Sequence, residues 1–131
     1  YNRIEYLSRS LIPAQAYYKA QKLRVLLRQQ VLGALEDFDV LVHPTAGVPA
    51  QKVEPEAAIG RKGVISRPFW LLTNSFSLAS TPALSVCCGF TSQNLPMGLQ
   101  IGSRPFDEQM ALRVAYAYEQ STPWHERKPP I

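Results

Sequence analysis

Apolar residues recur along the first third of the chain with the period of a helix. Between Pro13 and about Asp37, one stripe of them is spaced three and four residues apart, with Lys19, Lys22, Arg24, Arg28 and Gln29 largely opposite. The pattern predicts one long amphipathic helix over residues 13–37, with Pro13 suited to its first turn. Residues 1–12 carry no strong period, so we expect an irregular or partly helical lead-in there. The apolar stripe consists of Tyr17, Leu23, Leu27, Val31, Ala34 and Leu35.

A short apolar run at residues 38–42 predicts the first strand. Only Asp39 interrupts the run, and Pro44 stops it, so we expect a buried strand that ends at His43. Because ligands gather at strand ends in open α/β sheets, His43 and Thr45 are candidate site residues. For His43 a structural role is favoured, since the sequence shows no partner for it and a lone histidine rarely makes a complete site.

Two further apolar runs predict an antiparallel hairpin. Residues 83–88 are apolar and β-branched and are closed by Gly89, and residues 97–101 form a similar run. The six residues at 91–96 between them include serine, asparagine and proline, which favour turns. The two runs therefore predict adjacent strands joined by a short turn.

Two more helices are predicted around this hairpin. Residues 68–80 can form a helix that is apolar nearly all round, which indicates burial on several faces. After the hairpin, Asp107 can cap a helix that runs to Gln120, with Glu108 well placed in its first turn. The inward stripe of this last helix is expected to consist of Met110, Leu112, Val114, Ala115 and Tyr118.

The remaining segments are predicted to be irregular. Residues 46–67 hold three glycines and two prolines without any period, which indicates a long surface loop. This loop either shapes the mouth of a pocket or is a tolerated insertion. The tail, residues 121–131, contains adjacent prolines that exclude regular structure. We expect Trp124 to pack back on the body of the domain and His125 to lie on the surface.

Composition limits the class of protein. With 131 residues, 46% of them hydrophobic, the chain forms one domain or part of one. The net charge of +4 is scattered and does not form the basic face that nucleic-acid binding needs. No apolar run approaches the roughly 20 residues that span a bilayer. The chain has no initiating methionine, so we expect a fragment or a processed piece.

The two cysteines indicate neither a disulfide nor a metal site. Cys87 and Cys88 are adjacent within a predicted strand, where neighbouring side chains point to opposite faces and cannot readily bridge. A reducing, cytoplasmic setting fits such cysteines best. Nothing nearby would lower the pKa of either thiol into the range of a nucleophile, and no zinc-like ligand spacing occurs. We therefore expect no metal and no cofactor.

Several short motifs together resemble the C-terminal part of the amidase signature enzymes, which are serine hydrolases of amides. They follow the order and spacing of that family, and upstream Tyr17-Tyr18-Lys19-Ala20 with Arg24, and residues 39–45, resemble the segment that precedes them. The resemblance covers most of residues 14–129, except for residues 51–67. The motifs are Pro82-Ala83-Leu84-Ser85-Val86, Gly89-Phe90, Leu95-Pro96-Met97-Gly98-Leu99-Gln100, Pro105-Phe106-Asp107-Glu108 and Thr122-Pro123-Trp124-His125.

This resemblance implies an α/β fold. The family forms an α/β/α sandwich with a mixed sheet, of which this chain would supply three strands and three helices as the C-terminal portion of a single domain. Such a portion cannot cover both faces of its sheet alone. We therefore expect it to pack against a missing N-terminal part, in the same or a separate chain. A homodimer stays open as a further assembly, and neither nucleic acid nor membrane is expected as a partner of this chain.

The resemblance also locates the chemistry. The family uses a serine, a second serine in a cis peptide and a lysine, set in a Gly/Ser-rich loop, and no such loop occurs in this sequence. We therefore assign no catalytic residue to this chain and expect it to be inactive alone, with the nucleophile N-terminal to Tyr1. In the family the residues after the Pro-Thr pair approach the substrate, which makes Thr45 a candidate substrate-binding residue.

The sequence departs from the family pattern at several positions. Ser77 stands where the family usually has asparagine, Ser80 where it has glycine, and Cys87 where it often has proline. In the catalytic component of tRNA-dependent amidotransferases an acidic residue is expected near Trp70, to hold the ammonium group of glutamine. Trp70 cannot do so, which favours a less polar amide and makes Trp70, with Phe69, a candidate aromatic wall of the substrate pocket. Plain core packing is the alternative for both aromatics.

Three functions remain open from the sequence. The first is an amide hydrolase that acts on a small-molecule amide, with this chain as scaffold and pocket wall. The second is the catalytic component of a glutamyl- or aspartyl-tRNA amidotransferase, whose partners would be further subunits and a charged tRNA. The third is a non-catalytic interaction module that keeps the hairpin and helices as a docking surface.

Overall fold

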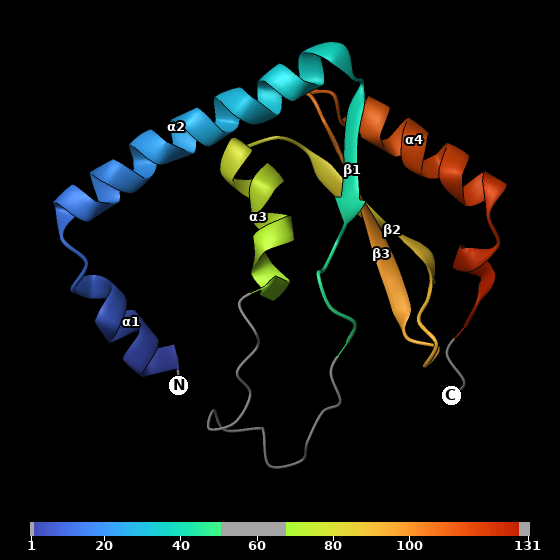
Figure 1. Ribbon diagram of the computed structural model, residues 1–131, viewed down its shortest axis with the longest axis horizontal. Coiled ribbons are helices and arrows are strands. Elements are labelled where there is room, and N and C mark those ends of the chain that lie inside the picture. Colours follow the sequence, from blue (N-terminus) through green and yellow to red (C-terminus); the bar gives the residue numbers. More distant parts are fainter. Residues whose placement is uncertain (1, 51–67, 129–131) are drawn as a thin grey trace.

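The computed structural model describes residues 2–50 and 68–128, with side chains from residue 6 in the first segment and from residue 72 in the second. Within these two segments, one sheet and four α-helices confirm the predicted α/β class (Figure 1). The three predicted strands are present, and the lead-in, expected to be irregular or partly helical, is a nine-residue helix. The elements are α1 (Asn2–Ser10), α2 (Ala14–Asp37), β1 (Val40–Pro44), α3 (Pro68–Ala79), β2 (Ala83–Phe90), β3 (Pro96–Ser103), α4 (Glu108–Ser121) and the short 3-10 helix η2 (Trp124–Glu126).

The sheet is antiparallel, with β3 between β1 and β2. The β2–β3 pair is the predicted hairpin. In the centre of the sheet, Ile101 lies opposite Val42 on one side and Leu84 on the other. A bulge between Cys87 and Gly89 shifts the register near the hairpin turn, and Gly89 has a φ of 141° there, a backbone conformation that side chains rarely allow.

One face of the sheet is apolar, and α4 covers its β2–β3 part. Residues opposite one another on antiparallel strands project to the same face, so Val42, Ile101 and Leu84 share it. Ile101 is completely buried and forms a cluster with Val86 and two alanines of α4. The cluster consists of Val86, Ile101, Ala111 and Ala115, with Val40, Leu84, Leu99, Val114 and Tyr118 packed around it.

The inward stripe of α4 differs from its prediction at one position. Leu112 is 61% exposed, whereas Ala111, which the predicted stripe omits, is buried. A small side chain at this point lets the helix approach the sheet closely, and the larger leucine is turned to solvent. The predicted cap is confirmed, because the Asp107 carboxylate accepts a hydrogen bond from the backbone amide of Met110 at 3.4 Å.

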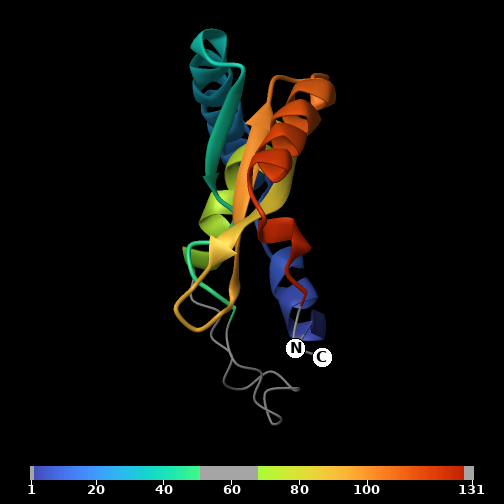
Figure 2. The ribbon, with the colours of Figure 1, turned by 90° about the vertical axis from the view of Figure 1, so that its right-hand side faces the viewer.

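The other face of the sheet carries small and polar residues and packs against α3. His43, Gln100 and Ser85 lie opposite one another across the three strands and therefore share this face. The buried ring of Phe76 on α3 lies against Gly102 of β3 and stacks on the ring of His43, with centroids 5.0 Å apart. Helices α3 and α4 thus lie on opposite faces, and the sheet forms the middle layer (Figures 1 and 2).

Helix α2 runs across the C-terminal end of α3 and extends beyond the sheet (Figure 1). Two of its basic residues, expected to face away from the apolar stripe, instead bind the C-terminal end of α3. Arg24 donates from Nε to the carbonyl of Leu78 at 2.8 Å and from Nη2 to Ser80 Oγ at 2.5 Å. Arg28 donates to the carbonyl of Ala79. The last carbonyls of a helix have no intrahelical donor, so the end of α3 draws these guanidinium groups inward.

The predicted apolar stripe of α2 is only partly buried. Leu35 is buried, whereas Tyr17 and Leu23 are each 58% exposed and Ala34 is also exposed. These three side chains are not covered by the described elements that pack against α2.

Strand β1 begins and ends later than predicted. Phe38, predicted to be buried in the strand, is the C-cap of α2 and lies exposed, while Pro44 still pairs with Leu99. The connection is held by Arg104, which donates to the carbonyl of Leu35 at 2.9 Å. It also donates to the carbonyl of Phe38 and to the Asp39 carboxylate, at 3.2 and 3.4 Å respectively. These contacts hold residues 38 and 39 in the turn between α2 and β1, so the strand starts only at Val40.

The loop predicted at residues 46–67 lies mostly outside the described residues, since the structure describes it only as far as residue 50. The tail, predicted to be irregular, contains the 3-10 helix η2 at Trp124–Glu126. Trp124 packs against Phe90 of β2 with ring centroids 6.2 Å apart, which confirms that it folds back on the domain. His125 is exposed, as predicted. Among the described helices none is both long and apolar enough to cross a membrane.

Candidate functional site

A pocket of about 440 Å³ lies where β1 ends, beside the polar face of the sheet. The chain leaves β1 at Pro44 and turns at Thr45, so the pocket is bounded by this turn, by β2 and by the start of β3. It includes Thr45, the residue that the sequence selects as substrate-binding. The lining consists of Pro44, Thr45, Ala46, Gly47, Val48, Pro49, Ala50, Ser85, Cys88, Thr91, Pro96, Met97, Gly98 and Leu99.

Two hydroxyl groups meet in the wall of this pocket. Thr45 Oγ1 lies 2.5 Å from Ser85 Oγ, and the pair spans from the end of β1 to β2 across β3. Gly98 makes this approach possible, because a Cβ atom there would lie 2.6 Å from Thr45 Oγ1 and 2.8 Å from Ser85 Oγ. Whichever hydroxyl donates to the other, one hydroxyl hydrogen and several lone pairs remain. The pair can therefore both donate to and accept from a neutral polar ligand such as an amide.

Among these pocket residues, the sequence indicated Thr45 but neither Ser85 nor Gly98. Ser85 and Gly98 reach it only through the strand register, which the sequence does not fix. The backbone amide of Thr45 donates to the carbonyl of Gly98 at 2.7 Å, and this bond extends the β1–β3 ladder by one residue. The spacing of small residues on the predicted hairpin is the one signal that could have indicated a crowded position there.

The two cysteines are both free thiols, and one of them lines the pocket. Burial raises the pKa of the Cys88 thiol, and the neighbouring Cys87 raises it further. A thiol with a raised pKa stays protonated at neutral pH, so Cys88 adds a small apolar surface to the pocket and not a nucleophile. Among the described residues, no group of three or more His, Cys, Asp or Glu side chains could hold a metal ion.

His43 does have a partner, which the sequence did not show. Its Nε2 atom lies 3.2 Å from Ser75 Oγ on α3, and its Nδ1 donates to the carbonyl of Pro44 at 2.8 Å. The distance resembles that of a serine and its general base, but the single Ser75 hydroxyl hydrogen is shared between two acceptors, His43 Nε2 and the carbonyl of Leu72 at 2.8 Å. Neither His43 nor Ser75 lines the pocket. The contact instead fastens β1 to α3 and holds the turn that carries Thr45.

The second predicted substrate-binding residue, Trp70, lies in the first turn of α3. Its side chain, like that of Phe69, is outside the described residues, so the aromatic wall stays a prediction. None of the described residues that line the pocket carries a charged side chain. The arrangement therefore suits an uncharged ligand with an apolar body and one amide-like polar group.

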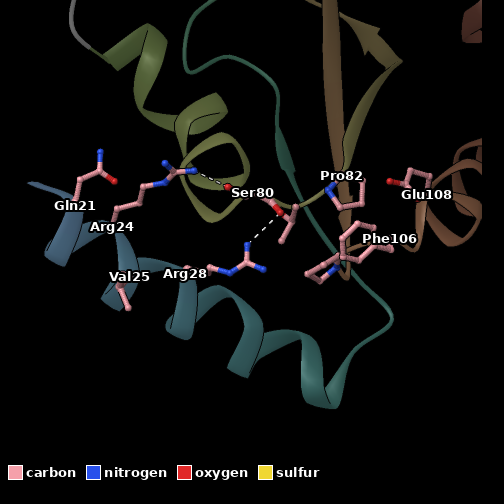
Figure 3. Close-up of a pocket in the computed structure, with 10 residues that line it drawn as sticks. Gln21, Arg24, Val25, Arg28, Ser80, Pro82, Phe106 and Glu108 are labelled. Carbon is pink, nitrogen blue, oxygen red and sulfur yellow. Dashed lines mark hydrogen bonds between the residues drawn. The ribbon is translucent and has the colours of Figure 1, made fainter.

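A separate, larger hollow of about 630 Å³ lies between α2, the end of α3 and the turn before α4. Figure 3 shows Arg24 and Arg28 on its α2 wall, Ser80 next to them, and Pro82, Phe106 and Glu108 on the opposite side. The sequence did not predict this hollow, because it depends on where α2 lies relative to the hairpin. Its lining consists of Gln21, Arg24, Val25, Arg28, Ser80, Thr81, Pro82, Pro105, Phe106 and Glu108.

Comparison with known proteins decides the family. The family model of the amidases matches residues 2–112, which is most of the chain and includes Thr45, Ser85 and Gly98. The chain belongs to the amidase family. The resemblance of the hairpin and the segment before it to amidase signature enzymes is thereby confirmed.

Among curated amidase relatives, the chain is similar to the A subunits of bacterial glutamyl-tRNA(Gln) amidotransferases. It is 47% identical over 116 residues to the protein of Thermodesulfovibrio yellowstonii and 48% identical over 118 residues to that of Synechococcus sp. strain JA-2-3B'a(2-13). Each match covers 88% of this chain but only 23% and 22% of the relative. The chain thus spans about a quarter of the length of the curated relatives it matches.

Solved amidase structures show the same fold. The glutamyl-tRNA(Gln) amidotransferase A subunit from Thermotoga maritima has a TM-score of 0.67 at 31% identity, over 93% of this chain and 26% of that one. A bacterial aryl acylamidase of the amidase signature family has a TM-score of 0.76 at 22% identity, over 91% of this chain and 25% of that one. The arrangement of α2, the sheet and α4 is therefore that of one part of an amidase domain.

Proposed function

We propose that residues 1–131 are the C-terminal portion of a single, larger amidase domain. The full enzyme would hydrolyse a carboxamide to a carboxylic acid and ammonia or an amine. This proposal is supported by the family match and by the quarter-length coverage of the curated relatives. The serine, cis-serine and lysine of the reaction would lie in the remainder of the domain, as the resemblance implies. This chain would supply scaffold and pocket wall and would be inactive alone.

The pocket at the end of β1 is the observation that carries the proposal. Amide hydrolysis needs the substrate to be held with its carbonyl oriented toward the nucleophile. The paired hydroxyls of Thr45 and Ser85 offer both a donor and an acceptor, which match the carbonyl and the N–H of an amide. We therefore propose that Thr45 binds the substrate in this pocket. Trp70 remains a predicted substrate-binding residue that would add an aromatic surface.

The chemistry of the pocket favours an uncharged amide as substrate. Free glutamine carries an ammonium and a carboxylate group, and burying such charges without partners costs several kcal/mol per ion. The described lining offers hydroxyls and apolar side chains but no charged partner. An aryl or aliphatic amide would meet these groups without such a cost. This preference agrees with the departure at Trp70.

A second candidate function is supported by the curated relatives. The proteins at 47% and 48% identity are A subunits of glutamyl-tRNA(Gln) amidotransferases. In that case the full enzyme would hydrolyse glutamine and would work with further subunits and a charged tRNA. A docking module without catalysis would be the third outcome. A reducing, cytoplasmic setting is proposed for all three, supported by the two free cysteines.

Comparing substrates on the full-length enzyme tests the proposal. Purified enzyme is expected to release acid from an aryl or aliphatic amide with a kcat/KM at least about tenfold above that for glutamine. A tenfold ratio corresponds to a difference of about 1.4 kcal/mol in transition-state stabilisation. A preference for glutamine would replace this assignment with that of an amidotransferase. Turnover of neither substrate would favour the docking module.

Replacing Thr45 with valine is expected to raise KM for the amide about fivefold and to leave kcat nearly unchanged. Valine has nearly the same shape but lacks the hydroxyl, so one hydrogen bond worth about 1 kcal/mol is lost. Steady-state kinetics on the full-length enzyme measure both constants. Ser121→Ala is the matched control, because the Ser121 hydroxyl donates to the carbonyl of Ala117 at the exposed end of α4. A lower melting temperature for Thr45→Val with an unchanged KM would reduce Thr45 to a structural role.

A further inference from the structure

Phe106 is the most exposed large hydrophobic side chain among the described residues, at 95%. It stands at the edge of the hollow between α2 and the turn before α4 (Figure 3). Val25, on the α2 wall of the same hollow, is also exposed. A fully exposed phenylalanine is costly in a soluble domain, and exposed apolar surface beside a hollow is typical of an interaction site.

The backbone at Phe106 is strained as well. The amide of Asp107 donates to the carbonyl of Arg104 at 3.1 Å, which closes a four-residue turn with Pro105 in its second position. Phe106, in the third position, has a φ of 63°, which is the left-handed region. A turn with proline second and a positive φ third normally takes glycine or asparagine there. Phenylalanine at this position therefore costs conformational energy that no described contact of its side chain offsets.

Both ends of the turn are fixed by neighbouring elements. Arg104 is bound to the carbonyl of Leu35 at the end of α2, and Asp107 caps α4. The buried hydroxyl of Ser103 donates to the carbonyl of Asp107 at 2.7 Å. The aromatic ring is thus presented by a turn that cannot relax easily. An exposed side chain held in this way binds with little loss of conformational entropy.

The hollow beside Phe106 also contains polar groups that can accept a partner. Arg24 and Arg28 each bind the end of α3 but use only part of their five N–H donors. Thr81 also lines the hollow, but its Oγ1 atom is itself buried and has no hydrogen-bond partner among the described residues. An occupant that offers backbone carbonyls to the unused N–H groups of the two arginines and an apolar side chain to Val25 and Phe106 would satisfy the site.

We propose that Phe106 is an aromatic anchor on which another segment of the same amidase domain docks, with the hollow taking that segment's backbone carbonyls and one apolar side chain. The inference rests on the proposed function, in which this chain is one part of a larger domain. The occupant is taken from that domain because this chain covers only 23% of the Thermodesulfovibrio relative and 25–26% of the solved amidases. The remainder of such a domain is the source of apolar surface that must pack nearby.

Thermal unfolding of the full-length protein tests the anchor with two glycine substitutions. Phe106→Gly relieves the strain at a positive φ but removes the ring, so the midpoint of unfolding is expected to fall by about 5 °C or more if the ring is buried in the complete domain. Asn94→Gly is the matched control, since Asn94 has a φ of 60° in the exposed hairpin turn. Its midpoint is expected to stay within about 1 °C of the parent. Phe106→Leu, which keeps an apolar side chain, should lose less than Phe106→Gly.

The results of these unfolding experiments distinguish a segment of the same domain from a second copy of the chain as the occupant of the hollow. A fall for Phe106→Gly at all protein concentrations, with Asn94→Gly unchanged, supports an intramolecular anchor. An unchanged or higher unfolding midpoint for Phe106→Gly overturns the intramolecular anchor. Relief of backbone strain would then account for the change, with no stability lost from removal of a buried ring. A fall accompanied by conversion of a dimer to a monomer in light scattering also overturns it, since the occupant would be a second copy. Amide hydrolysis is measured on the same parent preparation. Its absence would count against the proposed function while leaving the unfolding comparison readable.

Discussion

Replacing Gly102 with alanine is expected to destabilise the domain by about 3 kcal/mol, at the upper end of what overpacking usually costs. A Cβ atom at this position would overlap the ring of Phe76, which is buried between α3 and the sheet. The ring cannot move aside freely, because it also stacks on His43. The expected effect is a lower midpoint in thermal or denaturant unfolding of the full-length protein.

Two further variants test this explanation. Phe76→Leu makes room for the new methyl group, so the double variant Gly102→Ala/Phe76→Leu should lose less stability than the sum of the two single variants. Gly33→Ala is the control for a glycine without contacts, since nothing lies within 4 Å of a Cβ atom built there. Within α2 that change should stabilise by up to about 1 kcal/mol. Strict additivity of the double variant would show that the Phe76 ring is not the cause.

The 131-residue chain produced alone is expected to bind a hydrophobic dye and to self-associate. Large apolar side chains are exposed along α2, where Leu23 and Leu26 are 58% and 56% exposed. The outer edges of β1 and β2 have no strand partner among the described residues. Uncovered apolar faces and strand edges promote association between chains. Dye fluorescence and static light scattering measure both effects.

Introducing a charged side chain on α2 tests whether its exposed apolar face is covered by the rest of the domain in the full-length protein. Leu26→Lys should raise the solubility of the isolated chain, because it interrupts the apolar face. In the full-length protein the same change should lower the yield of folded enzyme, since a lysine would be buried against the rest of the domain. An isolated chain that is monomeric, binds no dye and melts cooperatively would contradict the proposal that it is part of a larger domain.

The helices and strands followed from local pattern because each depends on neighbours close in sequence. The period of Leu27, Val31 and Leu35 predicted α2, and the acidic cap at Asp107 predicted the start of α4. The local pattern was misleading where packing determines which residues of a helix point toward the sheet. Leu112 fits a helical stripe but is exposed, because the close contact of α4 with the sheet needs the smaller Ala111.

The role of Arg24 and Arg28 could not be read from the chain order. Both arginines look like a solvated helix face until the end of α3, more than fifty residues later, is placed beside them. The same holds for Phe106, whose motif resembles that of the family but whose exposure and left-handed backbone appear only in the fold.

The candidate site divides in the same way. The strand-end rule selected Thr45 from sequence, because a proline after an apolar run marks where a strand stops. The partner hydroxyl of Ser85 and the space left by Gly98 depend on the register of three strands. For His43 the sequence showed no partner, whereas the fold supplies Ser75 from another element.

The sequence by itself determined the amidase family, the α/β class, the types of the six elements from α2 to α4 and one residue of the pocket. These properties depend on short motifs and on the periodic spacing of apolar residues. Both are patterns among residues that are close together in the sequence. The tertiary structure alone decided which side chains meet: the Thr45–Ser85 pair, the arginines at the end of α3 and the outward ring of Phe106. Contacts of this kind join residues far apart in the chain, and their energies depend on register and packing that no local pattern specifies.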